Sequence, residues 1–272
     1  MRTIVHLSDL HFGRIDEAVI PPIIAQIHDI APDLIVVSGD LTQRARSEQF
    51  RQARQFLDAL PQPQIIVPGN HDIPLFNVVA RFFSPLTKYR RHITPQLQPT
   101  FIDEEIAVIG INTARSLTIK DGRVNDRQIE IARRELSTLG DHVVKIIVTH
   151  HPFDLPPGPR HHDLVGKALP AMRAFAICGA DMLLAGHVHA SSAVSSAGRY
   201  DIQGYSALVV QAGTATSTRS RGESNSFNVL RVEAHRIVVE RMSWQAEQGL
   251  FAPAAAQTFT QRGNAWSQTV TP

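Results

Sequence analysis

The first seventy residues alternate short apolar runs with stretches in which apolar residues recur every three or four positions. The runs at 3–7, 33–38 and 64–67 are rich in β-branched residues and predict buried strands. Between them, residues 19–30 and 47–60 have the spacing of amphipathic helices. This alternation of strand and helix predicts parallel pairing with right-handed crossovers.

The same alternation continues to residue 185, and afterwards the pattern changes. The middle of the chain predicts helices over 74–89, 126–139 and 164–178, and strands over 105–111, 143–148 and 181–185. A proline-rich loop is expected over 153–163. Beyond residue 190, short apolar runs follow one another without helical stretches between them, at 191–196, 207–211, 228–233 and 236–241. This spacing predicts an antiparallel region.

The C-terminal residues 246–272 are rich in Ala, Gln and Thr and have little periodicity. We therefore predict one domain over residues 1–245 and a C-terminal tail over 246–272. Such a tail could wrap around the body of the protein or around a partner chain, so a homodimer is one expectation.

The composition limits which classes of protein the chain can belong to. The chain has 272 residues, of which 43% are hydrophobic, so it can bury a core. Its formal net charge of +2 is too small to attract nucleic acid or a membrane by itself. The single cysteine, Cys178, cannot form an internal disulfide. The sequence begins directly with a strand pattern and has no apolar run of about 20 residues, so we expect a soluble cytoplasmic protein without a membrane partner.

Five short motifs rich in metal-ligating side chains lie where predicted strands end. They are Asp9-Leu10-His11, Gly39-Asp40, Gly69-Asn70-His71-Asp72, His150-His151-Pro152 and Gly186-His187-Val188-His189. Each motif alone also fits an ordinary turn or a surface histidine. In open α/β sheets, however, ligands bind outside the carboxyl ends of the strands. Together the five motifs therefore favour a single site at one edge of the fold.

The types of side chain in these motifs indicate the chemistry. Two carboxylates, one amide and four imidazoles suit Mn, Fe, Zn or Ni better than Ca or all-oxygen Mg. Alternate residues of an extended segment point the same way, so Asp9 and His11 can face one centre. Two ions need a bridging carboxylate, for which Asp40 is the predicted residue. Such a pair lowers the pKa of bound water and so supplies a nucleophile.

In this order, the five motifs resemble those of the calcineurin-like metallophosphoesterases over about residues 3–241. The resemblance implies an α/β fold with two packed mixed β-sheets flanked by helices, a four-layer αββα sandwich. It also implies two divalent or trivalent transition-metal ions as cofactors. One ion would be held by Asp9, His11, Asp40 and His189, and the other by Asp40, Asn70, His150 and His187.

The resemblance also implies roles for the residues beside the ligands. His71 would not bind metal; it would face the phosphoryl group and protonate the leaving oxygen. Asp72 would orient His71 by accepting a hydrogen bond from it. Asn70 would be part of the catalytic motif and would also bind a metal ion. His151 is the weaker alternative to His150 as a ligand.

The opening segment His6-Leu7-Ser8-Asp9-Leu10-His11-Phe12-Gly13 is most similar to class III cyclic-nucleotide phosphodiesterases and their glycerophosphodiesterase relatives. This implies metal-dependent hydrolysis of a 3',5'-cyclic nucleotide or a related small phosphodiester. A phosphomonoesterase, a nuclease and a lipid pyrophosphatase like the UDP-diacylglucosamine hydrolases remain alternatives on the same chemistry. The low net charge and the lack of a large basic insertion count against nucleic acid. A further alternative is a non-catalytic scaffold, as in the retromer subunit that resembles this fold.

Residues outside the five motifs could contact the substrate. Arg219, Arg221 and Arg115 follow predicted strands and could hold a phosphate, although solvated loops are the plain alternative. His161 and His162, in the proline-rich loop, are expected to face solvent. Phe82, Phe83 and the following Tyr89-Arg90-Arg91 could cover the site and stack on a base. A helix packed on the core with a basic outer face is the favoured alternative.

Overall fold

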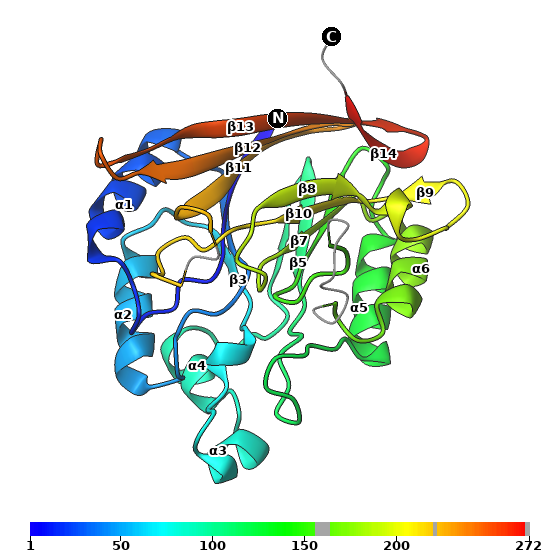
Figure 1. Ribbon diagram of the computed structural model, residues 1–272. Helices are drawn as coiled ribbons and strands as arrows, with labels where there is room; N and C mark the ends of the chain where they lie inside the picture. The colour runs from blue at the N-terminus through cyan, green and yellow to red at the C-terminus, as the bar shows by residue number, and fades with distance from the viewer. Residues whose placement is uncertain (156–163, 220–221, 270–272) are drawn as a thin grey trace.

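The computed structural model describes residues 1–155, 164–219 and 222–269. Two β-sheets pack face to face, and helices cover the outer face of each (Figure 1). This four-layer arrangement is the one that the motif resemblance implied, and the prediction of the fold class is confirmed. In the described residues, no helix combines the length and the apolar character needed to cross a bilayer.

The first sheet has eight strands and carries both ends of the described chain. Its strands, in spatial order, are β3 (Gln64–Ile66), β2 (Leu34–Val37), β1 (Arg2–Leu7), β11 (Ser226–Glu233), β12 (Arg236–Gln245), β13 (Leu250–Arg262), β14 (Asn264–Thr269) and β9 (Tyr205–Ser206). β1, β2 and β3 are parallel, as predicted from the first seventy residues. From β1 to β14 the remaining neighbours are antiparallel.

The second sheet has six strands with a parallel centre. Its strands, in spatial order, are β4 (Thr100–Ile102), β5 (Ile106–Gly110), β6 (Val144–Val148), β7 (Met182–Ala185), β10 (Leu208–Gln211) and β8 (Ser192–Ser195). β5, β6, β7 and β10 run parallel, and the two edge strands run antiparallel. The expectation of a wholly antiparallel region after residue 190 is therefore wrong for β10, which returns to lie beside β7.

The continuous apolar runs arise because the central strands are buried on both faces. In β1, Ile4 packs into the core between the two sheets, whereas Val5 packs beneath the helices. In β2, Val36 likewise packs between the two sheets and Val37 packs beneath the helices. Successive side chains of a strand point to opposite faces, so both faces require apolar residues here.

Helices of both layers follow the amphipathic stretches of the sequence. The helices are η1 (Glu17–Val19), α1 (Ile20–Ile30), α2 (Ser47–Asp58), η2 (Asn70–Asp72), α3 (Val78–Phe83), α4 (Thr87–His92), α5 (Asp126–Leu136), α6 (Ala168–Cys178) and η4 (Ser196–Gly198). α1, α2 and α4 cover the first sheet, and α5 and α6 cover the second. The single helix predicted over 74–89 is two short helices, since Pro85 removes a backbone donor and restricts Ser84 before it.

The predicted C-terminal tail is mostly sheet. Residues 250–262 and 264–269 form β13 and β14, and β12 pairs with β13 over most of its length. Phe259 and Trp266 from these strands are buried in the core between the sheets. The expectation of an irregular tail is wrong for these residues. The sequence did not reveal β13 because this strand is largely exposed and lacks an alternating apolar pattern.

Candidate metal centre

The five motifs converge at the carboxyl ends of β1, β2, β3, β6 and β7. Five of the seven predicted ligands have a left-handed backbone conformation: Asp9 (φ 53°), His11 (φ 51°), Asp40 (φ 53°), His187 (φ 72°) and His189 (φ 57°). Residues other than glycine seldom adopt positive φ, and such strain gathers at functional sites. The backbone therefore turns sharply after β1, β2 and β7 and directs these five side chains to one place.

Asp9, His11, Asp40 and His189 form one cluster of buried donors, with one donor atom of each residue within 4.8 Å of those of the others. Nε2 of His189 lies 3.2 Å from Oδ1 of Asp9 and 3.2 Å from Nε2 of His11. Nδ1 of His189 donates to the carbonyl of Arg219 (3.0 Å). That bond leaves the Nε2 lone pair free to bind a cation.

Two buried carboxylate oxygens indicate that this cluster fits a cation. Oδ1 of Asp9 and Oδ2 of Asp40 have no hydrogen-bond partner among the described residues. Leaving such oxygens buried and unpaired is costly, so protein structures normally supply a partner. A metal ion between them and the two imidazoles would satisfy both oxygens.

Asn70, His150 and His187 form a second group of donors. The side-chain oxygen of Asn70 lies 3.1 Å from Nε2 of His150 and 3.1 Å from Nδ1 of His187. Nδ1 of His150 donates to the carbonyl of Ser38 (2.8 Å), which again leaves Nε2 facing the group. These are the three residues predicted to hold the second metal together with Asp40.

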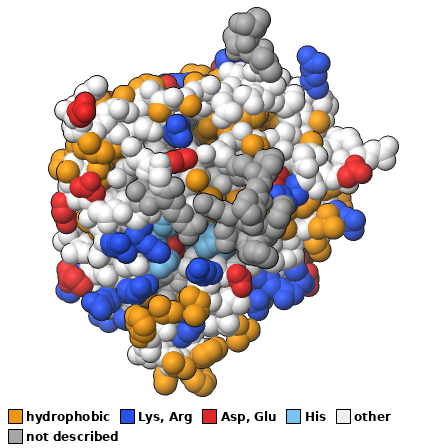
Figure 2. Space-filling model, viewed as in Figure 1, with side chains coloured by type: hydrophobic (Ala, Val, Ile, Leu, Met, Phe, Trp, Pro, Cys, Tyr) orange, Lys and Arg blue, Asp and Glu red, His pale blue; other side chains and the backbone are white. Residues whose placement is uncertain are grey.

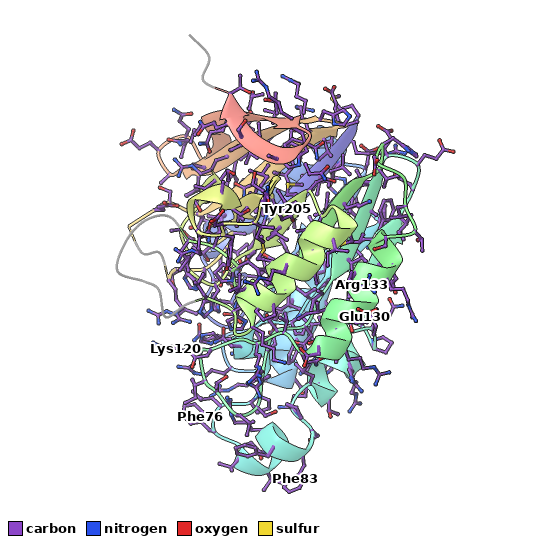
Figure 3. The ribbon with its side chains drawn as sticks, turned by 90° about the vertical axis from the view of Figure 1, so that its right-hand side faces the viewer. Phe76, Phe83, Lys120, Glu130, Arg133 and Tyr205 are labelled. Carbon is purple, nitrogen blue, oxygen red and sulfur yellow. The ribbon has the colours of Figure 1, made fainter. Side chains whose placement is uncertain are left out.

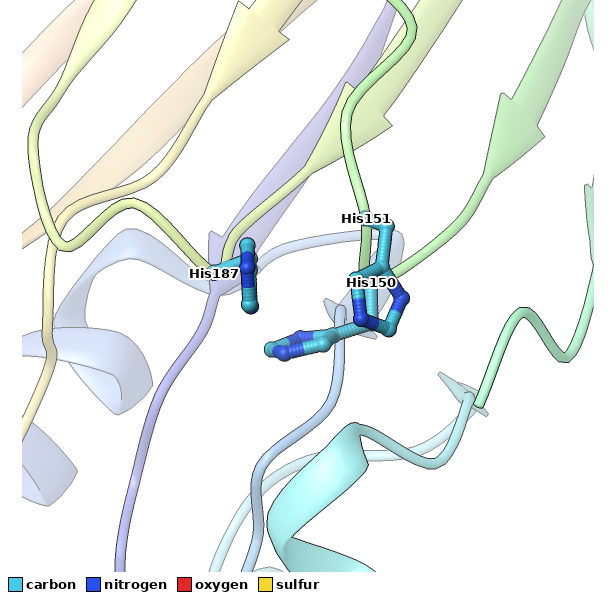
Figure 4. Close-up of side chains that lie close together, drawn as sticks. All are labelled: His150, His151 and His187. Carbon is cyan, nitrogen blue, oxygen red and sulfur yellow. The ribbon is translucent and has the colours of Figure 1, made fainter. Parts of the chain in front are cut away.

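His151 lies close to His150 and His187, whose rings approach from the loops after β6 and β7 (Figure 4). Both of its nitrogens are engaged by the protein. Nδ1 lies 2.8 Å from Oγ1 of Thr113, and Nε2 donates to the carbonyl of Lys120 (2.7 Å). His150, whose Nε2 is not bonded to a backbone group, is therefore the better-placed donor of the pair.

Asp40 lies between the two groups. Its Oδ2 is 3.7 Å from Nε2 of His11 in one group and 3.4 Å from Nε2 of His150 in the other. Its Oδ1 accepts a hydrogen bond from the backbone of His71 (2.8 Å). Burial raises the pKa of Asp40, but the neighbouring His150 and His71 outweigh burial and hold that pKa below its ordinary value. A charged carboxylate in this position suits a bridge between two cations.

His71 lies at the rim of the site and is partly exposed. Its Nδ1 donates to the carbonyl of Gln43 (2.9 Å), and its Nε2 accepts from Nη1 of Arg219 (3.0 Å). Nε2 is 4.0 Å from Oδ2 of Asp40. His71 thus faces the same space as the candidate ligands without belonging to either donor group.

Asp72 does not have the role that the resemblance implied. Its carboxylate accepts from the backbone N–H of Leu41 (3.1 Å), Thr42 (2.9 Å) and Gly69 (2.9 Å) and from the Thr42 hydroxyl (3.0 Å). Asp72 therefore ties the Asp40 loop to the Asn70 loop. The predicted bond from His71 is wrong, because the Gln43 carbonyl accepts from His71 instead. A backbone acceptor of this kind leaves no signal in the sequence.

A pocket of about 190 Å³ opens beside the donor groups. It is lined by Gln43, Arg44, Asn70, His71, Ile73, Leu75, Arg81, Ile119, Lys120 and Arg219. Of the predicted substrate residues, Arg219 lines this pocket and Arg115 is not among its lining residues. Arg221, His161 and His162 lie outside the described residues. Arg44 and Lys120 were missed, since isolated loop cations carry no motif.

Two glycines allow the loops to approach one another. A Cβ atom on Gly186 would lie 1.7 Å from Oγ of Ser8, and one on Gly69 would lie 2.1 Å from Oδ1 of Asp40. Both distances are shorter than any tolerated contact. These glycines are required by the close packing of the ligand loops.

The structure therefore places two groups of candidate metal ligands beside a pocket lined by basic side chains. The sequence profile of the calcineurin-like phosphoesterases matches residues 2–191. The chain belongs to that family, and the resemblance drawn from the motifs is confirmed.

Two relatives in sequence are phosphodiesterases by description. The chain is 29% identical over 170 residues to glycerophosphodiester phosphodiesterase GpdQ of Enterobacter lignolyticus, covering 56% of this chain and 58% of that protein. It is 23% identical over 161 residues to a protein of Synechococcus described as a probable cyclic nucleotide phosphodiesterase, covering 55% and 58%. The matched region thus spans little more than half the length of these relatives.

Solved structures share the fold at low identity. Purple acid phosphatase PPD1 from yellow lupin superimposes with a TM-score of 0.70 at 12% identity, covering 95% of this chain and 53% of that one. A dimetal phosphatase from Danio rerio superimposes with a TM-score of 0.67 at 14% identity, covering 95% and 98%. These likenesses establish the architecture alone.

Proposed function

We propose that this protein hydrolyses small phosphodiesters with two transition-metal ions at the ends of its parallel strands. The observation that carries the proposal is the position of Asp40, whose buried, unpaired Oδ2 faces one donor group through His11 and the other through His150. The family and the two phosphodiesterase relatives support the same class of reaction. The mixed oxygen and nitrogen donors favour Mn or Fe, with Zn and Ni as alternatives.

Each residue has a distinct task in this proposal. Two cations bound here would neutralise charge on the phosphate and provide activated water as the nucleophile. Arg219 would bind a phosphate oxygen from the pocket side, since its guanidinium already reaches Nε2 of His71. His71 would carry a proton on Nε2 to the leaving alkoxide, with Nδ1 held by the Gln43 carbonyl.

The substrate that we propose is a 3',5'-cyclic nucleotide or a related small phosphodiester. The pocket of about 190 Å³ suits one phosphate ester with a compact substituent, and Arg44 and Lys120 at its wall suit an anion. Phosphomonoesters, nucleic acid and lipid pyrophosphates are alternatives on the same residues. A non-catalytic scaffold is disfavoured, because the seven candidate ligands and His71 are all placed around one site.

The test is hydrolysis of three substrates before and after metal removal. Bis-p-nitrophenyl phosphate, cyclic AMP and p-nitrophenyl phosphate separate diesterase from monoesterase activity. We expect diester hydrolysis to disappear after chelation and to return with Mn²⁺. Turnover that persists in the chelated protein, or turnover of the monoester alone, would contradict the proposal.

A further inference from the structure

Helix α3 has an inverted distribution of side chains. Arg81 is the residue that this helix buries, whereas Val78, Val79, Phe82 and Phe83 are 61%, 70%, 51% and 86% exposed. A helix packed on a domain normally buries its apolar side chains and directs its cations to water. The arrangement of α3 therefore needs an explanation other than core packing.

Neighbouring segments enlarge this apolar area. The exposed side chains at this end of the molecule, which we call the α3 surface, are Phe76, Val78, Val79, Phe82, Phe83, Leu117 and Ile119. Figure 2 shows hydrophobic side chains gathered around α3 at the lower end of the protein, with Lys and Arg side chains beside them. Figure 3 places Phe76, Phe83 and Lys120 toward this same end. Contiguous apolar exposure of this kind marks an interaction site more often than scattered residues do.

Arg81 fixes the α3 surface in place. Its guanidinium donates to the backbone carbonyls of Ser116 (2.7 Å), Pro74 (3.1 Å) and Thr118. These bonds join α3 to the loop that carries Leu117 and Ile119. Hydrogen bonds from a cation are stronger than neutral ones. The protein thus holds these apolar side chains outward on an anchored element.

Basic residues outnumber acidic ones in the segments that form the α3 surface. Besides the buried Arg81, residues 73–102 contain Lys88, Arg90 and Arg91 and no acidic residue. Residues 106–121 contain Arg115, Lys120 and one acidic residue, Asp121. The guanidinium of Arg44 lies over the ring of Phe76, 5.7 Å from its centroid. The small net charge of the whole chain conceals this local excess of positive charge.

We propose that the α3 surface docks on bilayers that contain anionic phospholipids. Exposed apolar side chains among Lys and Arg are the combination that binds the interfacial region of such bilayers. A second copy of this chain is the competing occupant. A two-fold contact would place the same cationic surroundings of both copies opposite one another, which is unfavourable. Charge complementarity therefore favours the lipid surface, and this proposal of peripheral docking differs from the sequence expectation of no membrane partner.

Docking would bring the candidate metal centre to the lipid headgroups. Ile119 belongs to the α3 surface and also lines the pocket with Arg44 and Lys120. Resting on the proposed function, this position assigns phosphodiesters of lipid headgroups as a substrate class. Water would add to phosphorus, one P–O ester bond would break, and the leaving alkoxide would take a proton. The products are an alcohol and a phosphomonoester.

The docking surface is tested by sedimentation of the protein with vesicles. Vesicles of phosphatidylglycerol and phosphatidylcholine should carry the protein down, and vesicles of phosphatidylcholine alone should not. The double variant Phe82→Ser/Phe83→Ser should bind the anionic vesicles at least about tenfold more weakly. The matched control is Ile177→Ser on α6, where an apolar side chain is 73% exposed, and it should bind as the unaltered protein does.

Hydrolysis of bis-p-nitrophenyl phosphate provides a separate readout. The Phe82→Ser/Phe83→Ser variant should retain this activity, since neither residue lines the pocket. If the unaltered protein bound anionic vesicles but did not hydrolyse bis-p-nitrophenyl phosphate, this result would count against the proposed function alone. Absence of sedimentation with anionic vesicles, or equal sedimentation of the double variant, would overturn the docking proposal. It would also be overturned if the unaltered protein were a dimer that the double variant converts to a monomer.

Discussion

The guanidinium of Arg219 donates to Nε2 of His71 across 3.0 Å. The same residue accepts a hydrogen bond from His189 at its backbone carbonyl. Arg219 therefore contacts a candidate ligand through its main chain and the proposed proton donor through its side chain. A phosphate that enters the pocket would replace His71 as the partner of this guanidinium.

Replacing Arg219 with Lys should impair the use of diester substrates. Lysine keeps the charge but loses the planar fork that binds a phosphate through two parallel bonds. We expect kcat/KM for bis-p-nitrophenyl phosphate to fall by roughly tenfold, about 1.4 kcal/mol. Steady-state kinetics measure the change, with Arg231→Lys on the exposed face of β11 as the control. Unchanged kcat/KM in the Arg219 variant would contradict a role for this residue in binding the substrate.

Replacing His71 with Ala should lower kcat while the protein keeps its metal. General acid catalysis contributes roughly 10² to 10⁴ in rate. The loss should be larger for a diester with an alkyl leaving group than for one that releases p-nitrophenolate, because a stable anion needs less protonation. Metal content by atomic absorption is the control measurement. An equal loss for both leaving groups would argue against proton donation by His71.

Replacing Asp40 with Asn should remove metal from both donor groups. The neutral amide cannot supply the charge that Oδ2 presents to His11 and His150. We expect both metal content and diester hydrolysis to fall to background, as measured by elemental analysis and by kinetics. Asp58→Asn, at the exposed end of α2, serves as the control. A variant that is fully loaded and active would contradict the bridging position of Asp40.

The buried His6 should make the free energy of unfolding depend on pH below 6.5. Burial lowers the pKa of His6 to about 3 from its ordinary value of 6.5. Between these values the unfolded chain binds a proton that the folded protein does not bind. The free energy of unfolding should therefore be highest above pH 6.5 and fall toward pH 3, by up to about 1.4 kcal/mol per pH unit.

Urea unfolding of chelated protein at several pH values measures this dependence. His6→Asn should show a shallower fall in the free energy of unfolding below pH 6.5 than the unaltered protein. The same substitution at the exposed His142 serves as the control. Identical slopes for the His6 variant and the unaltered protein would exclude His6 as the source.

Sequence patterns predict the parallel half of the fold well because its strands are buried on both faces. β1 and β2 appear as unbroken apolar runs, and the ligands follow directly where those runs end. β13 gives no such signal, since Phe251 and Phe259 are buried eight residues apart in a strand that is otherwise largely exposed. Its partners β12 and β14, and not its own composition, determine that it is a strand.

Some residues of the candidate site can likewise be predicted from the sequence, and others cannot. Ligands such as Asp40 and His189 are recognisable because their side chains stand in short fixed motifs. The acceptor for His71 is a backbone carbonyl at Gln43, which any residue could supply. Lys120 reaches the pocket from a loop that Arg81 holds through the Ser116 carbonyl, and Arg44 reaches it from a separate loop. Such contacts depend on three-dimensional proximity, which local patterns do not encode.

The positive φ angles at Asp9, His11, Asp40, His187 and His189 have a consequence for ion loading. The ends of the strands set the positions of these five side chains, so exchange of a bound ion would require no refolding of the chain. Imidazole and carboxylate ligands bind several first-row cations with affinities that rise from Mn to Cu, so the types of ligand alone do not select one ion. In the proposed centre, the supply of cations would then help to decide which ion is held, and a change in that supply would exchange the ion without altering the scaffold.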